Sequence, residues 1–246
     1  MPLPTLAVPT YELSLPSTGK KVKYRPFLVK EEKVLLLAME SEDEKEVERA
    51  VKQTLTACIQ TRGVKVENLA TFDLEYLFLK IRSVSAGEDI KMRVTCQDDG
   101  ETQVTVAIDI EQIKVDKPEG HNRKIMLNDD TGLVMKYPGF KQFVDLTLLG
   151  KDLDTTESVF SLVADCIDQV FQGEEVWDAK DMKKSEVVTF LESMTQQQFE
   201  LVQTFFETMP TLKHEFTATN PNTGVESTYT LEGLQSFFGW ACFIIL

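Results

Sequence analysis

Histidine and cysteine are the residues best suited to metal binding or nucleophilic chemistry, and this chain of 246 residues contains few of them. The two histidines and four cysteines are His121, His214, Cys58, Cys96, Cys166 and Cys242. The cysteines form no Cys-x-x-Cys pair, and neither histidine lies at a ligand spacing from a cysteine. We therefore expect no bound metal and no cofactor. Thiols used in this way suit a reducing cytosol, where they are buried as small apolar groups.

Two short turns resemble the knuckles of a zinc ribbon in their position near the ends of hairpins. They are residues 96–100, "CQDDG", and residues 220–224, "NPNTG". The first contains one cysteine and the second contains none, so the pair lacks the four ligands that zinc requires. We interpret them as ordinary hairpin turns, or at most as metal-free remnants of a ribbon.

Carboxylates are abundant but do not form a recognisable site. The stretch "DLDTTESVF", residues 152–160, matches a calcium loop only at its first and third positions. Glu157 stands where that loop requires glycine, and Val163 where it requires a bidentate glutamate. An acidic helix start at Asp154 and Thr155 explains the stretch better. The sequence also lacks a glycine-rich phosphate loop, a nucleophile elbow and a metalloprotease motif. Nothing in it indicates catalysis.

The overall charge restricts the partners of this chain. Forty acidic residues oppose 26 basic ones, which gives a formal net charge of −14. Nucleic-acid binding needs clustered lysine and arginine, so we expect none. An acidic surface instead favours encounter with a basic partner. The acidic stretch "ESEDEKEVER", residues 40–49, is interpreted as the solvated first turns of a helix, with docking of a basic partner as the alternative.

The first half of the chain predicts helices between two hairpins. Alternating apolar residues around Gly19 predict a hairpin over residues 11–24, and Asp99-Gly100 predicts another over residues 90–110. A helix is expected over residues 30–39, a second one with a Ser41–Glu44 capping box, and a third capped by Thr71. The polar segment 115–123, which contains both proline and glycine, is the natural seam.

Beyond the seam the same order of elements recurs. A hairpin that turns at Thr131-Gly132 and a final hairpin that turns near residues 222–224 enclose four predicted helices. Those helices are expected over residues 140–149, 155–172, 185–194 and 196–208, and the last begins with a Thr195–Gln198 capping box.

The two halves also share a sequence pattern. "TGKKVKYRPF", residues 18–27, and "TGLVMKYPGF", residues 131–140, match in their Thr-Gly and Lys-Tyr pairs, and their glycines lie 113 residues apart. We therefore predict an α+β fold of two tandem, duplicated units, in which helices are flanked by antiparallel β-hairpins. The first unit spans residues 1–115 with an extended N-terminal arm, and the second spans residues 123–246. Residues 10–110 should superpose on 123–231, with Gly19 and Gly132 in equivalent turns and Tyr24 and Tyr137 on equivalent strands.

The two ends of the chain differ in character. Residues 1–9, "MPLPTLAVP", lack the basic start of a signal peptide, and no apolar run reaches the ~18 residues of a membrane span. The C-terminal stretch 237–246, "FFGWACFIIL", is strongly apolar and needs a surface to receive it, either in its own second unit or on a partner. Its large side chains are the candidate partner contacts: Phe237, Phe238, Trp240, Phe243, Ile244 and Ile245.

Three segments of this chain resemble one family of phage proteins. They are "PTYELSLPSTGKKVKYRPFLVKEEKVLL", "GEEVWDAKD" and "FFETMPTLKHEF" followed by "NPNTGVESTYTLEGLQSFF". Together they are similar to the baseplate hub subunit of T-even-like phages with contractile tails, which is also described as a hub assembly protein or chaperone. Some members of that family carry paired cysteines in the closing hairpin, where this chain has "TNPNTG", and this departure removes metal from the interpretation.

The resemblance implies a role in building the hub of a phage tail and implies no reaction. We therefore expect a non-enzymatic baseplate hub subunit or hub assembly factor that acts through protein–protein contacts with other hub or tail proteins. The alternatives are a dissociable tail assembly chaperone that is absent from the virion and, in a different class, a tail-tip hydrolase. The expected location is the host cytoplasm during assembly and the virion baseplate if the chain is retained.

Overall fold

The computed structural model describes residues 6–41, 43–150 and 155–237, apart from the side chains at 235 and 237. The chain forms two compact units, each of mixed helix and antiparallel sheet, so the α+β class is confirmed. Unit 1 consists of Met1–Asp116, Phe140–Leu149 and Thr211–Leu246. Unit 2 consists of Lys117–Gly139 and Gly150–Pro210.

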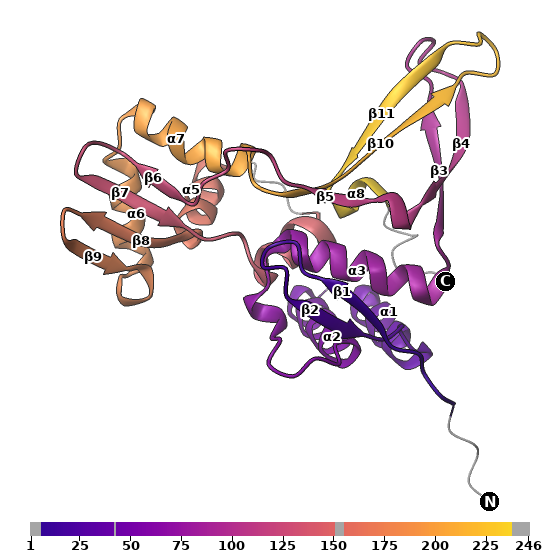
Figure 1. Cartoon of the computed structure of the whole chain (residues 1–246), viewed down its shortest axis with the longest axis horizontal. Coiled ribbons are helices and arrows are strands. Elements are labelled where there is room, and N and C mark those ends of the chain that lie inside the picture. The colour runs from indigo at the N-terminus through magenta and orange to yellow at the C-terminus, as the bar shows by residue number, and fades with distance from the viewer. Residues whose placement is uncertain (1–5, 42, 151–154, 238–246) are drawn as a thin grey trace, which may run out of the picture. The chain divides into compact units, whose positions relative to one another are not determined.

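Unit 1 combines three hairpin-forming strand pairs with a group of helices (Figure 1). Its strands are β1 (Tyr11–Ser14), β2 (Lys21–Tyr24), β3 (Asp89–Thr95), β4 (Gln103–Asp109), β5 (Lys114–Asp116), β10 (Thr211–Thr219) and β11 (Glu226–Glu232). Its helices are α1 (Val29–Glu40), α2 (Glu44–Cys58), α3 (Thr71–Ala86), α4 (Phe140–Gln142), a π-helical turn (Phe143–Leu148) and α8 (Leu234–Phe237), with short 3₁₀ turns at Val66–Asn68 and Ile110–Gln112.

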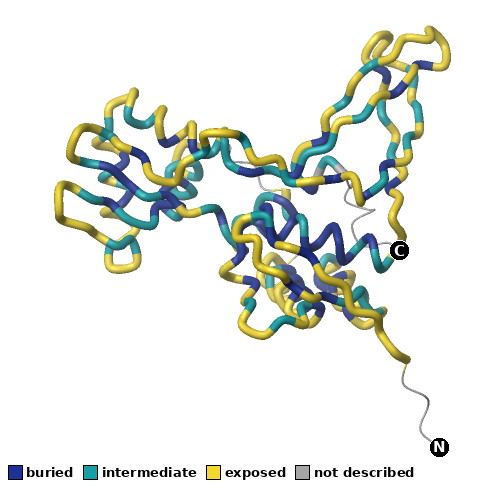
Figure 2. Tube along the Cα trace, viewed as in Figure 1, coloured by how far each residue is buried: buried dark blue, intermediate teal, exposed yellow. Residues whose placement is uncertain are grey.

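Helix α3 lies at the centre of the unit 1 core. Most of its residues are buried on every side, which Figure 2 shows as a nearly continuous dark-blue stretch. Leu74, Leu77, Leu79 and Ile81 are fully buried. Each such side chain contributes about 1.5–3 kcal/mol when it is removed from water. A helix that is apolar on nearly all faces needs partners all around it, and α1, α2, the π-helical turn and the closing strands supply them.

The unit is closed by strands that lie far apart in the sequence. β10 pairs antiparallel with β11 and also with β5, in a three-stranded sheet of order β11-β10-β5. Thr211 lies opposite Asp116 and Leu212 lies opposite Val115. Leu212 is fully buried in the core that contains Ile113. The C-terminal hairpin therefore belongs to the same core as the first 116 residues.

Local polar contacts define where α1 and α2 begin. The Glu31 carboxylate accepts hydrogen bonds from the Leu28 amide at 2.8 Å and from Arg25 at 3.0 Å. Burial raises the pKa of Glu31, but these donors outweigh it and the pKa is lowered. Helix α2 is capped by Asp43, whose side chain accepts from the amides of Lys45 and Glu46. The predicted Ser41–Glu44 capping box is wrong by two residues, because the Ser41 hydroxyl donates to the Ala38 carbonyl instead.

Helix α3 also begins differently from the prediction. It starts at Thr71 itself, and its N-cap is Ala70, which makes no side-chain capping bond. The carboxylate of Asp73 in its first turn accepts hydrogen bonds from the amide and the hydroxyl of Ser17. This contact attaches the turn of the β1–β2 hairpin to the start of α3.

Unit 2 is a four-stranded antiparallel sheet with helices. The strand order is β6-β7-β8-β9, and every pair is antiparallel. The strands are β6 (Lys124–Met126), β7 (Thr131–Met135), β8 (Ile167–Gln172) and β9 (Glu175–Asp178), and the helices are α5 (Thr156–Asp165), α6 (Lys184–Glu192) and α7 (Gln196–Glu207). The Thr195–Gln198 capping box at the start of α7 is confirmed. Ile125, Leu133 and Val170 face a core that the helices cover with Val187, Leu191, Val202 and Phe205.

The predicted turn at Thr131-Gly132 is wrong. Both residues belong to β7, and the turn lies earlier, at residues 127–130, where the Asn128 side chain accepts from the amides of Asp130 and Thr131. Glycine is needed at position 132 because there is no space for a side chain, and not because the backbone has a positive φ. A Cβ at this position would lie 2.4 Å from Cζ of Phe171 and 2.5 Å from the Ile125 carbonyl oxygen. The missing side chain lets the Phe171 ring cross the strand.

The helix predicted over residues 155–172 is correct only in its first part. Helix α5 ends at Asp165, and the remainder forms β8, which turns tightly at Gly173 into the unpredicted strand β9. Gly173 has φ +58°, a conformation that side chains rarely adopt. The predicted helix over residues 140–149 is helical, but residues 143–148 form a π-helix.

The structure does not confirm the tandem duplication. Gly19 occupies a turn with φ +69°, whereas Gly132 lies within a strand, so the two glycines are not equivalent. The compact units also divide the chain differently from the predicted spans 1–115 and 123–246, because residues 140–149 and the final hairpin belong to unit 1. Similar sequence patterns here accompany different local structures.

A single buried carboxyl group joins three separate segments of unit 1. Glu75 on α3 is 8 % exposed, and the Thr147 hydroxyl of the π-helical turn donates to it at 3.1 Å. The Leu234 amide at the start of α8 also donates to it. Burial raises the pKa of Glu75 to about 7, although both hydrogen bonds act in the opposite direction.

We predict that Glu75→Gln stabilises unit 1 at alkaline pH. The folded-state pKa is raised, so the wild-type contribution is complete below the unfolded value and is lost as the pH rises toward about 7. Glutamine keeps an acceptor oxygen and has no charge. The variant should match the wild type at pH 4, below the unfolded pKa, and exceed it at pH 8 by at most about 3 kcal/mol.

Urea unfolding at the two pH values measures this difference. Glu46→Gln, an exposed change on α2, is the matched control and should leave the pH dependence as in the wild type. Identical pH dependence for Glu75→Gln and wild type would contradict the role given to this carboxyl.

Candidate interaction surfaces

The two long hairpins of unit 1 meet at their tips through side-chain hydrogen bonds. The β3–β4 hairpin and the β10–β11 hairpin both extend from the helices, as Figure 1 shows. The Asn220 amide nitrogen donates to both carboxylate oxygens of Asp98 at 3.0 Å and to Asp99 at 2.9 Å. The Thr223 hydroxyl also donates to Asp98. We call this group of residues 96–102 and 220–224 the tip clamp.

The two turns of the tip clamp have the same backbone pattern. The Gly100 amide donates to the Cys96 carbonyl at 3.0 Å, and the Gly224 amide donates to the Asn220 carbonyl at 2.8 Å. The positions that the sequence marked as ribbon knuckles therefore do come together. They are joined by carboxylate, amide and hydroxyl groups. Elsewhere along the hairpins, the Tyr229 hydroxyl donates to the Thr95 carbonyl at 3.1 Å.

Charge in the tip clamp is fixed by these donors. Hydrogen bonds from Asn220 and Thr223 hold the pKa of Asp98 below its usual value, and those from Thr102 do the same for Asp99. Both carboxylates therefore stay ionised and act as hydrogen-bond acceptors. Burial, together with these two carboxylates, raises the pKa of the Cys96 thiol. Among the residues that the structure describes, no group of three or more His, Cys, Asp or Glu side chains could hold a metal ion.

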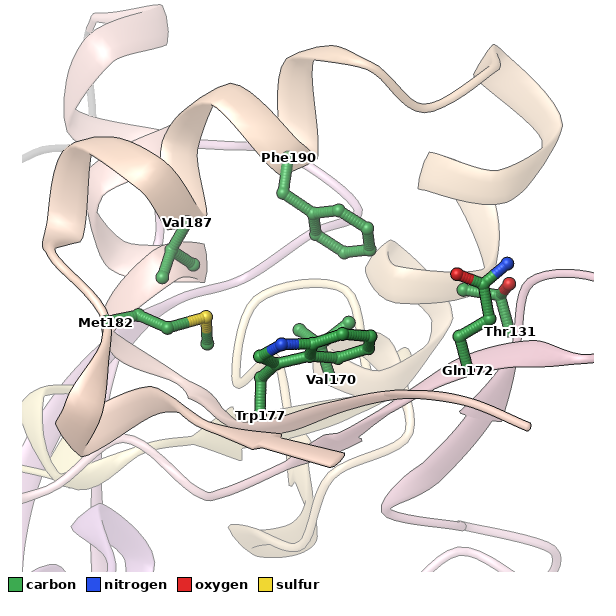
Figure 3. A pocket seen from close by; sticks show the side chains of 7 residues that line it. All are labelled: Thr131, Val170, Gln172, Trp177, Met182, Val187 and Phe190. Carbon is green, nitrogen blue, oxygen red and sulfur yellow. The ribbon is translucent and has the colours of Figure 1, made fainter. Parts of the chain in front are cut away.

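Unit 2 contains a pocket of about 330 Å³ between its sheet and helix α6. Figure 3 shows Trp177 of β9 lying across the pocket, with Phe190 and Val187 of α6 facing it. The remaining lining residues are Thr131, Val170, Gln172 and Met182. Trp177 is 41 % exposed, which is unusual for so large a side chain beside a core. Sequence analysis missed this site because β9 was not predicted. The Gly173-Glu174 pair between two apolar stretches was the available signal.

The histidines and cysteines do not come together. His121 lies in unit 2, where its Nδ1 is 3.0 Å from the Thr208 hydroxyl. Its ring stacks on Tyr137 and packs at a tilt against Phe205. Burial lowers the pKa of His121. His214 lies in β10 of unit 1, beside the ring of Phe216. Cys58, Cys96 and Cys166 are buried thiols, and Cys242 lies outside the described residues.

The predicted partner contacts at the C-terminus are mostly not described. Phe237 is the last residue of α8, whereas Phe238, Trp240, Phe243, Ile244 and Ile245 lie outside the described residues. In the acidic stretch, Asp43, Glu44 and Glu46 are exposed, as expected for a solvated helix start, and Glu42 lies outside the described residues. No described helix is both long enough and apolar enough to cross a membrane.

Comparison with known protein families places this chain. A family model described as T4 bacteriophage base plate protein matches residues 8–239. Since this is almost the whole chain, the protein belongs to that family of phage baseplate proteins. No curated protein and no solved structure matches it.

We predict that Asn220→Asp separates the two hairpin tips at neutral pH. The substitution replaces the shared donor with a third carboxylate facing Asp98 and Asp99, and like charges this close repel. Hydrogen exchange of residues 96–102 and 219–226 should accelerate roughly ten-fold or more. Gln103→Glu is the matched control, because it adds the same charge at an exposed position just outside the tip clamp and leaves the Asn220 bonds in place. Equal exchange in both variants would refute the clamp.

Proposed function

We propose that this protein is a non-enzymatic subunit of the phage baseplate hub that acts through contacts with other tail proteins. The observation that carries the proposal is the baseplate family match across residues 8–239. The assignment to the hub rests on the three sequence segments that resemble hub subunits. Those segments contribute to the β1–β2 hairpin, the β8–β9 turn and the β10–β11 hairpin.

The chemistry of the described carboxylates supports a binding role over hydrolysis. A tail-tip hydrolase needs an accessible acid with a raised pKa beside a second carboxylate. Asp98 and Asp99 are neighbours, but their pKa values are lowered and their oxygens accept hydrogen bonds within the tip clamp. Glu75 has a raised pKa, but it is buried in the unit 1 core. Neither arrangement offers a proton to a substrate.

The first test of the proposal is the content of mature virions. We expect this chain to sediment with purified tails and to keep a fixed ratio to a known baseplate protein after high-salt washing. Quantitative mass spectrometry of gradient fractions measures both. Absence from washed virions, combined with tail assembly that fails when the chain is deleted, would favour the dissociable chaperone.

We also propose that the apolar C-terminal stretch contacts a partner. Deletion of residues 240–246 removes Trp240, Phe243, Ile244, Ile245 and Leu246, and each large apolar side chain contributes ~1.5–3 kcal/mol when it is buried. The truncated chain should assemble into tails at least roughly ten-fold less well, while its melting temperature stays near that of the full chain. A marked loss of melting temperature would instead assign the stretch to the chain's own core. Unchanged assembly and stability would show that the stretch is inert.

A further inference from the structure

The outer edge of the unit 2 sheet is an unpaired strand. β9 is the last strand of the order β6-β7-β8-β9, and no other described strand pairs with its free side. Alternate backbone groups of an edge strand point away from the sheet and are available to an added strand. Native proteins usually protect such edges with charges, prolines or bulges. β9 has a charge at each end, Glu175 and Asp178, but its two central residues, Val176 and Trp177, are apolar and are 57 % and 41 % exposed.

The pocket lies beside this edge. In the register of β8 and β9, Val170 lies opposite Trp177, and both side chains line the pocket (Figure 3). A pocket of about 330 Å³ accommodates one large apolar side chain. A strand added along β9 would direct every second side chain toward this face of the sheet. Edge pairing and pocket filling are therefore compatible in a single extended segment, as in other cases of β-augmentation.

Four acidic residues lie in the two turns next to the end of the pocket that Thr131 and Gln172 form. Asp129 and Asp130 precede β7, and Glu174 and Glu175 follow β8. The two turns lie side by side, because the Gly173 amide donates to the Asp130 carbonyl at 2.9 Å. All four side chains are exposed. None of them forms an ion pair with a described residue, whereas Asp178 and Asp165 elsewhere in unit 2 are paired with Lys180 and Lys184.

Three segments could pair with β9: a second copy of β9, the chain's own residues 238–246, or a segment of another protein. The charges around β9 discriminate among them. Antiparallel pairing of β9 with a second copy would place Glu175 opposite Asp178 of the other copy, and like charges directly opposite are destabilising. The net charge of −14 also opposes self-association. The apolar C-terminal stretch 238–246 contains no lysine or arginine and leaves the four carboxylates without partners. A segment of another protein that has one large apolar side chain and neighbouring basic residues can fill the pocket and pair with the four carboxylates.

We infer that β9 and the adjoining pocket bind an extended segment of another tail protein, with one large apolar side chain in the pocket and lysine or arginine against Asp129, Asp130, Glu174 and Glu175. The inference rests on the proposed function for the class of partner. Its affinity depends on exposed charge pairs, so it should weaken with added salt.

The test is site-specific photocrosslinking in infected cells. A chain that carries p-benzoyl-phenylalanine at position 176 is irradiated before the tails are purified, and mass spectrometry identifies the crosslinked peptide. We expect a peptide of another tail protein in which basic residues flank a large apolar one. The same label at Met126, which is 44 % exposed on the opposite edge strand β6, is the positional control and should not capture this peptide.

A charge-reversal variant tests the electrostatic part. Glu174→Lys combined with Glu175→Lys should lower the crosslink yield from position 176 at least ten-fold. Glu200→Lys combined with Glu207→Lys makes the same charge change on α7 and should leave the yield unchanged. Melting curves of both variants establish that unit 2 stays folded.

Each outcome separates this inference from the proposed function. A crosslink to a second copy, to residues 238–246 or to no protein would overturn the inference even if the chain is found in virions. A crosslink to a basic segment of a tail protein would support it even if washed virions lack the chain and the hub proposal fails. Equal loss of yield in both charge variants would also overturn it.

Discussion

The antiparallel pairing of β10 with β5 is the constraint on which the rest of unit 1 depends. It sets Thr211 opposite Asp116 and buries Leu212 in the core that α3 organises. The intervening chain, residues 117–210, forms unit 2, except that residues 140–149 also belong to unit 1. Unit 1 is therefore assembled from three separate stretches of sequence, and a boundary drawn at the polar seam after residue 115 cannot describe it.

Polar contacts fix how these three stretches of unit 1 are arranged, because apolar burial by itself has no preferred direction. Glu75 receives hydrogen bonds from the π-helical turn and from the start of α8, so one carboxyl connects the central helix to the two later stretches. At the far end of the hairpins, Asn220 and Thr223 bind Asp98. Leaving a buried polar group without a partner costs more free energy than a typical hydrogen bond contributes. Arrangements that break these contacts are therefore disfavoured, and the native one is preferred over its near alternatives.

Much of the secondary structure could be predicted because the signals were local. The hairpins over β1–β2, β3–β4 and β10–β11 follow from alternating side chains and from turn glycines, and α7 follows from its capping box. The predictions were wrong where tertiary contacts, and not the local sequence pattern, determined the secondary structure. Gly132 looked like a turn residue, but it is needed where the Phe171 ring crosses β7. Residues 167–172 continued a helical pattern, yet they form β8 because β7 and β9 are available on both sides.

The candidate sites divide in the same way. The sequence marked the two turns of the tip clamp, but it did not reveal that Asn220 would reach both Asp98 and Asp99 across more than a hundred residues. The pocket beside Trp177 could not be predicted, since it requires β9, β8 and α6 to be placed together. The family match, by contrast, follows from sequence alone and covers residues 8–239.

The closing role of β10 has a consequence for biosynthesis. A ribosome releases the chain from its N-terminus, so α3 leaves the exit tunnel long before Leu212 and Leu231, which complete its surroundings. Contacts between distant parts of a sequence form slowly, because a long loop must close first. Unit 2 is built from residues 117–139 and 150–210 alone and can finish folding while the core of unit 1 is still open. The apolar surface of the first 116 residues thus stays accessible until synthesis is almost complete, and during that interval it is open to chaperones and to aggregation.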